Sequence, residues 1–330
     1  MKAFKNHYKH TSHFFKSEIL RVVFTFQNIY VGQNPFKASA IFAMLPFLEL
    51  TDGVWFPKGG MQQIIQNLLT IATEHGVEIV YNAHIEKINV EGKKVSGITL
   101  SDGSIQKSDI VVSNADLPYV YERLLPKNKT INRIKKMDYT CSAFMFHWGL
   151  DKTYPKLEQH NVFVANNYKE NIDAVFTDLT LPSDPSFYVH APCRTDRSAA
   201  PENEDTLSII VPVGHLNGNE QNWKTLQDHA RKSVIDRLKS EGMPDIEEHI
   251  KFEICYNPKS WETRFNLSRG SVFGSLSHKL MQMGYMRPHN QHRKFKNLFF
   301  VGGSTHPGNG IPMVLLSAKL TTEKILKYQH

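Results

Sequence analysis

The chain has 330 residues, of which 41% are hydrophobic, so it can build the core of one large domain or two moderate ones. Lys and Arg number 39 and Asp and Glu 32, a net charge of +7, and no basic block with interleaved aromatics indicates nucleic-acid binding. Three distant cysteines, Cys141, Cys193 and Cys255, argue against a disulfide framework and against a C-x-x-C metal or redox pair.

We expect no secretory signal in the first fifty residues. Met1–Lys16 is polar, and the apolar run after it is interrupted by Arg21, so we expect an intracellular protein that is not secreted. His7, His10 and His13 recur every third residue without an acidic partner at ligand spacing, and we expect them to be solvated rather than to bind metal.

The longest stretch without charge is residues 38–48. It is too short to span a bilayer and contains Pro46. Two interpretations remain: a buried core segment, or one wall of a monotopic patch that dips into the lipid surface. The mild positive charge likewise fits either a solvated surface or attraction to an anionic membrane.

A helix and a β-meander are predicted next. After a glycine turn at residues 55–60, apolar residues recur at helical spacing until Gly76, which we expect to end the helix. Glycine turns at residues 91–92 and 102–103 then separate short apolar runs. The predicted strands are 78–81, 85–90, 95–100 and 110–113.

From Pro118 the pattern changes to longer elements. Residues 141–150 and 206–213 read as strands, the second of them central, and residues 221–242 as a helix with one apolar face. Residues 187–201 are rich in turn residues. Their Arg194 and Arg197 fit either ordinary surface positions or anchors for a partner or a lipid phosphate.

The most informative segment is 297–324. It predicts a buried strand (298–301), a loop with four glycines and a helix opened by Pro312. Glycines remove the Cβ atoms that keep another molecule from the backbone, and free N–H groups at a helix start favour a polarised or anionic ligand. We expect those groups to belong to Ile311, Met313 and Val314.

The string VGGSTHPGNGIP at residues 301–312 closely resembles the C-terminal flavin-contacting segment of the phytoene desaturase family, within the flavin amine-oxidase-like superfamily. Residues 55–61, 111–116 and 21–27 with Pro35 also look like segments of that family, in family order. The resemblance implies FAD as cofactor. The cofactor-binding residues that it implies are Gly302, Gly303, Ser304, Thr305, Gly310, Ile311, Pro312, Met313, Asn114 and Ala115.

The implied fold is α/β (α+β mixed): an incomplete FAD-binding Rossmann-like domain and a discontinuous substrate-binding domain with a mixed β-sheet and helices. No G-x-G-x-x-G motif for the FAD pyrophosphate occurs in these 330 residues. The expected divisions are a substrate- or membrane-side segment (1–54), part of the FAD domain (55–117), the substrate domain (118–290) and the C-terminal FAD segment (291–330).

The implied reaction is stepwise dehydrogenation of phytoene or a related C40 carotene by an enzyme at an intracellular membrane surface, such as the endoplasmic reticulum. No catalytic residue can be named: Asp116 and Glu262 are candidates, but surface or capping roles fit both. An apolar set is expected to line the substrate channel: Phe273, Leu276, Leu280, Met281, Met283 and Met286.

Other readings stay open because of the missing pyrophosphate motif. The chain fits a truncated enzyme, a fragment that needs a complementing N-terminal piece or a homo-oligomer, or a non-catalytic protein that binds lipid or carotenoid. A flavin-dependent retinoid saturase or amine oxidase is a further alternative.

Overall fold

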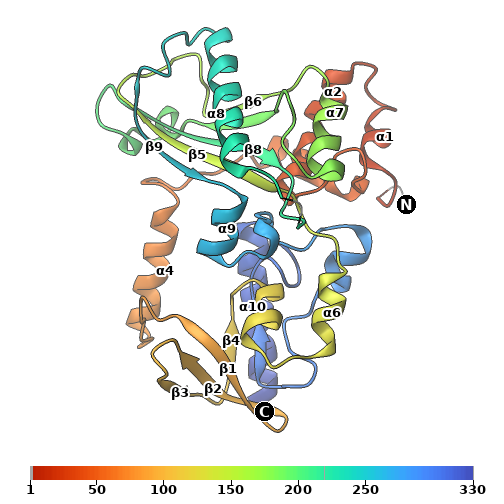
Figure 1. Ribbon diagram of the computed structural model, residues 1–330, viewed down its shortest axis with the longest axis vertical. Helices are drawn as coiled ribbons and strands as arrows, with labels where there is room; N and C mark the ends of the chain where they lie inside the picture. Colours follow the sequence, from red (N-terminus) through yellow and green to blue (C-terminus); the bar gives the residue numbers. More distant parts are fainter. Residues whose placement is uncertain (1–2, 219, 330) are drawn as a thin grey trace. The chain divides into compact units, whose positions relative to one another are not determined.

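Two compact units make up the chain, and each is assembled from separate stretches of it. The computed structural model describes residues 3–218 and 220–329 (Figure 1). The first unit comprises Met1–Phe47, Tyr81–Thr140 and Trp261–His330, and the second comprises Leu48–Val80 and Cys141–Ser260.

Both units are thus discontinuous. They divide the chain at other positions than the domain limits expected at 117/118 and 290/291, which stay a prediction. Residues 118–140 and 261–290 group with the first unit because their apolar side chains join its core. Ile134 and Leu276 pack in one cluster with Leu298 and Phe300. The glycine turn and helix of residues 55–80 group with the second unit.

The first unit contains two small sheets. Strands β4 (Val111–Ser113) and β10 (Leu298–Phe300) pair in parallel, and β1 (Ile85–Glu91), β2 (Lys94–Leu100) and β3 (Ile105–Lys107) form an antiparallel meander. The Asn297 side chain links the two sheets. Its Oδ1 accepts from the Val95 N–H at 2.9 Å, and its Nδ2 donates to the carbonyls of Val95 and Asp109 at 2.9 and 2.7 Å.

Helices of this unit are mostly short, apart from α10. They are α1 (His7–Thr11), α2 (Glu18–Val23), α5 (Leu117–Tyr119), α6 (Lys129–Lys135) and α10 (Ile311–Gln329). Two further helices, α3 (Met44–Thr51) and α9 (Pro258–Phe265), cross from one unit to the other along the chain.

The second unit is built on a five-stranded sheet of order β6-β7-β8-β5-β9, with β8 in the middle as expected (Figure 1). All four pairings are antiparallel, so the prediction of a mixed sheet is wrong for this unit. The strands are β5 (Ser142–Leu150), β6 (His160–Phe163), β7 (Phe187–His190), β8 (Asp205–Val213) and β9 (Ile250–Tyr256).

Two helices belong with this sheet, α7 (Tyr168–Asp173) and the long α8 (Trp223–Ser240). The predicted apolar face of α8 is buried: Ala230, Val234 and Leu238 pack in one cluster with the inward side chains of β5 and β8. Asn222 caps the helix by accepting the Thr225 N–H at 3.1 Å.

The remaining helix, α4 (Gln62–Glu74), forms where the sequence predicts it and ends before Gly76, whose φ is +76°. None of its residues is buried, although its apolar residues share one face. The strand predicted at residues 78–81 is absent. This extended segment forms no ladder with another described strand, and its Val80 and Tyr81 are exposed.

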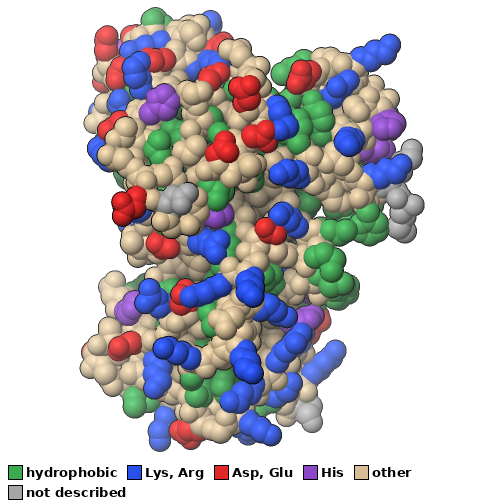
Figure 2. All heavy atoms as spheres, turned by 45° about the vertical axis from the view of Figure 1, so that its right-hand side comes forward, with side chains coloured by type: hydrophobic (Ala, Val, Ile, Leu, Met, Phe, Trp, Pro, Cys, Tyr) green, Lys and Arg blue, Asp and Glu red, His purple; other side chains and the backbone are tan. Residues whose placement is uncertain are grey.

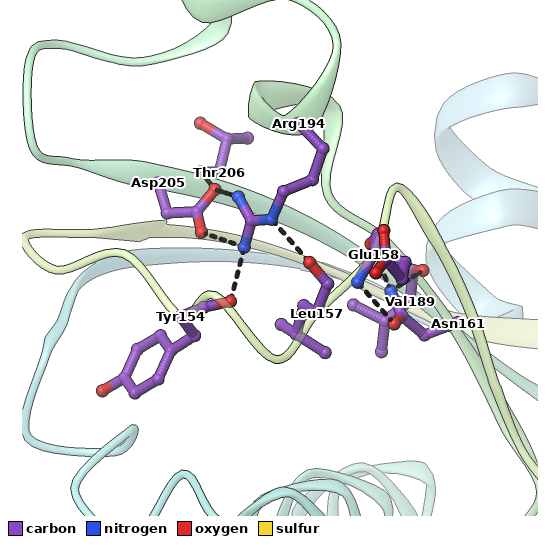
Figure 3. A network of polar contacts seen from close by, with 8 residues as sticks. All are labelled: Tyr154, Leu157, Glu158, Asn161, Val189, Arg194, Asp205 and Thr206. Atoms are coloured by element: carbon purple, nitrogen blue, oxygen red, sulfur yellow. Dashed lines mark hydrogen bonds and ion pairs between the residues drawn. The ribbon is translucent and has the colours of Figure 1, made fainter.

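Arg194 is neither a surface arginine nor a free anchor for phosphate. Figure 3 shows its guanidinium directed at Asp205 and at backbone carbonyls of the loop before β6. Nη2 lies 2.8 Å from the carboxylate of Asp205, whose side chain is 0% exposed, and Arg194 also donates to the carbonyls of Leu157 and Tyr154 at 2.6 and 2.9 Å. Arg194 thereby fixes its own loop and the loop before β6 to the first residue of β8.

Residues near the N-terminus depart from expectation in one place. His7 is buried, and its Nδ1 lies 3.3 Å from Asn28 Oδ1, so it is not a solvated histidine, whereas His13 is exposed. In residues 38–48, Ala38 and Pro46 are buried, as in a core segment, while Phe47 is exposed, as the alternative of a lipid-contacting patch requires. Within the described ranges, every helix is too short or too polar to cross a lipid bilayer. All three cysteines are free thiols.

Candidate cofactor site

The carboxyl ends of β4 and β10 bring two predicted segments together. Leu298 pairs with Val111 and Phe300 with Ser113, and the chains continue into Asn114 and Gly302. A Cβ atom on Gly302 would lie 2.5 Å from Asn114 Oδ1, and Gly302 has a φ of +101°. Glycine is therefore required here by the neighbouring strand end and by the backbone itself. The carboxyl ends of parallel strands are where ligands bind in open α/β sheets.

Hydroxyl groups fix the glycine-rich loop from within. Ser304 Oγ accepts the Leu117 N–H at 2.9 Å, and Thr305 Oγ1 donates to the Gly302 carbonyl at 3.0 Å. Ser317, in α10, accepts from the Gly302 N–H at 3.3 Å and donates to the His306 carbonyl at 2.9 Å. Ser304 and Thr305 are both buried, so their side chains hold the loop rather than extend from it.

The start of α10 is open. A Cβ atom on Gly310, whose φ is +94°, would meet no atom within 4 Å, and Ile311 and Met313 are 45% and 40% exposed. Among the described residues no acceptor lies within hydrogen-bond distance of their N–H groups. The Val314 N–H, which we expected to be free, donates to the Gly310 carbonyl at 2.9 Å, because it closes the first turn of the helix.

A buried arginine that sequence reasoning missed holds this loop in place. Arg287 is 1% exposed and donates seven hydrogen bonds, all to backbone carbonyls. Two of these carbonyls belong to the loop, those of Gly303 at 2.6 Å and Thr305 at 3.0 Å. The others belong to Gly274, Leu276, Ser277 and Gln282. Burial lowers the pKa of the guanidinium to about 10, and the charge of Asp116 opposes this shift.

Two more titratable groups support the same loop. Asp116 is buried and accepts the Ser268 N–H at 3.0 Å. Burial raises the pKa of its carboxyl group, while hydrogen bonds from Ser268, Ser275 and Ser304 oppose the shift. His278 Nε2 lies 3.4 Å from the Asn309 N–H, and burial together with the charge of Arg287 lowers the pKa of its imidazole to about 3. The imidazole is therefore neutral at pH 7 and accepts at Nε2.

Comparison with known proteins assigns the family. The sequence model of the family "Flavin containing amine oxidoreductase" matches residues 4–326. The chain belongs to this family.

Its curated relatives include a zeta-carotene-forming phytoene desaturase of Myxococcus xanthus, 43% identical over 332 residues, and a phytoene desaturase of Phycomyces blakesleeanus, 40% identical over 328 residues. These matches cover 100% and 96% of this chain but only 64% and 56% of the relatives. The chain thus spans about three fifths of the length of the curated relatives that it matches.

Solved structures agree on the fold. An oxidoreductase from Methanosarcina mazei superposes with a TM-score of 0.66 at 16% identity, and the match covers 96% of this chain and 68% of that oxidoreductase. Wild-type putrescine oxidase bound to putrescine gives a TM-score of 0.58 at 13% identity, over 99% of this chain and 68% of its own. The predicted α/β class is confirmed.

The cofactor that the family implies is FAD, and the residues at the start of α10 fit such a group. Open space beside Gly310 admits a flat ligand close to the backbone, and the N–H groups of Ile311 and Met313 have no acceptor of their own among the described residues. The helix dipole favours electron-rich ring atoms at that end. Pro312 contributes no N–H and suits this first turn. Asn114, which is exposed, and Ala115 adjoin the loop on the β4 side.

The apolar set before this segment does not line one channel. Leu276 is 0% exposed in the core of the first unit, whereas Met281 and Met286 are 72% and 62% exposed and lie at a cavity described below. Leu276 is spaced in the sequence like its neighbours, but its pairing with Tyr139 draws it into the core. Glu262, on α9, is exposed.

Proposed function

We propose that this chain provides the flavin-contacting part of an FAD-dependent phytoene desaturase, an oxidoreductase that converts phytoene to more conjugated carotenes. The observation that supports this proposal most directly is the open start of α10 beside Gly310. Arg287 fixes the loop before this helix by hydrogen bonds to two of its backbone carbonyls. The sequence identities of 43% and 40% to the phytoene desaturases of Myxococcus xanthus and Phycomyces blakesleeanus support the substrate class.

Bound FAD supplies the hydride acceptor for removal of hydrogen from a C–H bond. The protein residues would hold it: the N–H groups of Ile311 and Met313 would donate to it, and Gly310 leaves open space beside the backbone. Arg287 and the neutral His278 keep the loop in this geometry by hydrogen bonds to its backbone. Asp116 is assigned a supporting role, because its carboxylate accepts a backbone N–H within the protein interior.

Phytoene is favoured over 4,4'-diapophytoene as the substrate. The phytoene desaturases of Myxococcus xanthus and Phycomyces blakesleeanus are 43% and 40% identical to this chain, compared with 34% for a 4,4'-diapophytoene desaturase of Staphylococcus haemolyticus. Cells that accumulate one or the other hydrocarbon distinguish the two, since coloured products form only from the accepted substrate.

Association with an intracellular membrane surface is part of the proposal, because a hydrocarbon substrate of this kind partitions into lipid. Large apolar side chains of the N-terminal stretch are exposed and suit such contact. They include Phe4, Phe14, Ile19, Met44 and Phe47.

The test is flavin retention by matched glycine variants. Gly310→Val places a branched side chain in the space assigned to the ring, and we expect loss of the flavin absorbance near about 450 nm. Gly103→Val is the control: it also has a positive φ, +84°, with no atom within 4 Å of its Cβ position, but it lies in the turn between β2 and β3. Backbone strain alone costs roughly 1–3 kcal/mol in either variant.

We expect Gly103→Val to retain flavin and to form coloured carotenes in phytoene-accumulating cells as the wild type does. Full flavin occupancy in Gly310→Val would refute the assigned site. A wild-type chain that carries no flavin and gains none when FAD is added, alone or with an N-terminal segment of a relative, would refute the proposed function.

A further inference from the structure

A cavity in the first unit is lined largely by residues that precede the glycine-rich loop in the sequence. It measures about 920 Å³, a volume at the upper end of ligand pockets, and its walls come from α6, the segments that flank it and residues 281–295. All of its lining residues belong to the first unit.

The rim of this cavity is basic. Six exposed cations line it and no Asp or Glu does: Lys127, Lys129, Arg133, Lys136, Arg293 and Lys294. Within the described part of the chain, none of the six forms a salt bridge. Figure 2 shows Lys and Arg gathered on the lower part of the surface with few acidic side chains among them. Like charges around one cavity repel one another, and an anion bound among them relieves this repulsion.

Two of the rim cations are arginines, Arg133 and Arg293. Arg133 and Arg293 both lower the pKa of Tyr121, opposing the effect of burial that raises it to about 12, and both also act on His289. Tyr121 and His289 line the same cavity as the two arginines. Arginine pairs of this kind bind phosphate through forked hydrogen bonds.

Apolar side chains line the cavity as well. Leu117, Ile134 and Phe300 are buried beneath it. Met281 and Met286 lie beside the basic rim with 72% and 62% of their surface exposed. A ligand that fills this cavity therefore meets both cations and apolar side chains.

We propose that the cavity binds a phosphate-bearing amphiphile, with the phosphate between Arg133 and Arg293 and the hydrocarbon part against Met281 and Met286. The cavity shares Arg287 with the support of the glycine-rich loop, but Gly310, Ile311 and Met313 are not among its lining residues. A membrane phospholipid and a dissolved phosphate ester of a long-chain alcohol or acylglycerol share this chemistry. The two sources are separated by the assay.

The assay compares three probes. Binding to phosphatidylcholine vesicles with and without phosphatidic acid is measured by sedimentation. Binding of dissolved dioctanoyl phosphatidic acid and of inorganic phosphate is measured by calorimetry. We expect the wild-type chain to bind the phosphatidic acid vesicles, or the dissolved lipid alone if the source is a free amphiphile. Binding to neither form of phosphatidic acid overturns the proposal.

The decisive variant is Arg133→Gln/Arg293→Gln. A basic residue near an anionic lipid surface contributes about fivefold in affinity, so we expect binding to weaken about 30-fold. The control Lys94→Gln/Lys107→Gln removes the same charge from exposed positions of β2 and β3 that do not line the cavity. Since exposed charges are screened beyond about 10 Å, we expect it to lose less than about threefold. Equal losses in the two variants overturn the proposal.

A second variant tests the apolar end. Met281→Ser/Met286→Ser replaces two exposed side chains, so the fold is expected to stay intact. It should weaken binding of phosphatidic acid and leave the affinity for inorganic phosphate unchanged. An unchanged affinity for phosphatidic acid would overturn the assignment of the hydrocarbon part.

Discussion

Replacement of Arg287 by Met tests whether one buried side chain maintains the glycine-rich loop. Met matches much of the volume of the side chain but donates no hydrogen bond. The substitution removes all seven bonds to backbone carbonyls, including those to Gly303 and Thr305 of the loop. The loop then loses its attachment to the segment around Gly274 and Leu276.

The expected destabilisation follows from the two loop carbonyls. Each buried carbonyl that loses its donor costs roughly 1–3 kcal/mol, which gives about 2–6 kcal/mol for Gly303 and Thr305 together. Removal of the buried charge relieves part of its desolvation cost and offsets losses at the other four carbonyls. We therefore expect about 4 kcal/mol, a large part of the 5–15 kcal/mol typical of a domain.

Urea denaturation measures this free energy, and flavin absorbance measures the effect on the site. Arg123→Met is the control, because Arg123 is exposed and we expect a change within about 0.5 kcal/mol. A stability loss below about 1 kcal/mol in Arg287→Met, with flavin occupancy unchanged, would show that the loop holds its shape without this residue.

Two further predictions concern other buried polar groups. His292 Nδ1 accepts the N–H groups of Lys294 and Phe295 at 3.1 and 2.9 Å, and burial lowers the pKa of its imidazole from 6.5 to about 4. The folded state therefore binds this proton less well than the unfolded state, so the free energy of unfolding falls by about 3 kcal/mol as the pH drops from 6.5 to 4. The variant His292→Asn keeps an acceptor and should lack that part of the decline. Parallel curves of stability against pH for the variant and the wild type would contradict this. Arg194→Met leaves the buried Asp205 carboxylate unpaired and should lower the free energy of unfolding, measured by thermal denaturation, by about 3–5 kcal/mol. The double variant Arg194→Met/Asp205→Asn should recover part of this loss. An Arg194→Met variant as stable as the wild type would contradict the structural role of Arg194.

The sequence predicts those elements whose signal is local. Strand β8 and helix α8 appear within a residue or two of their predicted limits, because apolar spacing and caps such as Asn222 act over a few positions. The glycine-rich loop was found for the same reason: Gly302 and Gly310 occupy positive-φ positions that few other residues adopt.

Features that depend on distant partners were missed. Arg287 reads as a surface residue, since its burial arises from carbonyls of chain segments on both sides of it. Arg194 likewise meets Asp205 and Tyr154 only once the sheet has formed. The segment at residues 78–81 has strand composition but pairs with no described strand, and composition alone does not supply a partner.

The interleaved layout of the two units has a consequence for the order of folding during synthesis. Most of the second unit, Cys141–Ser260, emerges from the ribosome as one stretch, whereas the core of the first unit joins Ile88 and Val120 to Leu298 and Phe300. The early part of that core must therefore wait, with apolar surface uncovered, until the last strand is made. Prior folding of the inserted stretch shortens the effective loop that has to close, which lowers the entropic barrier to late docking.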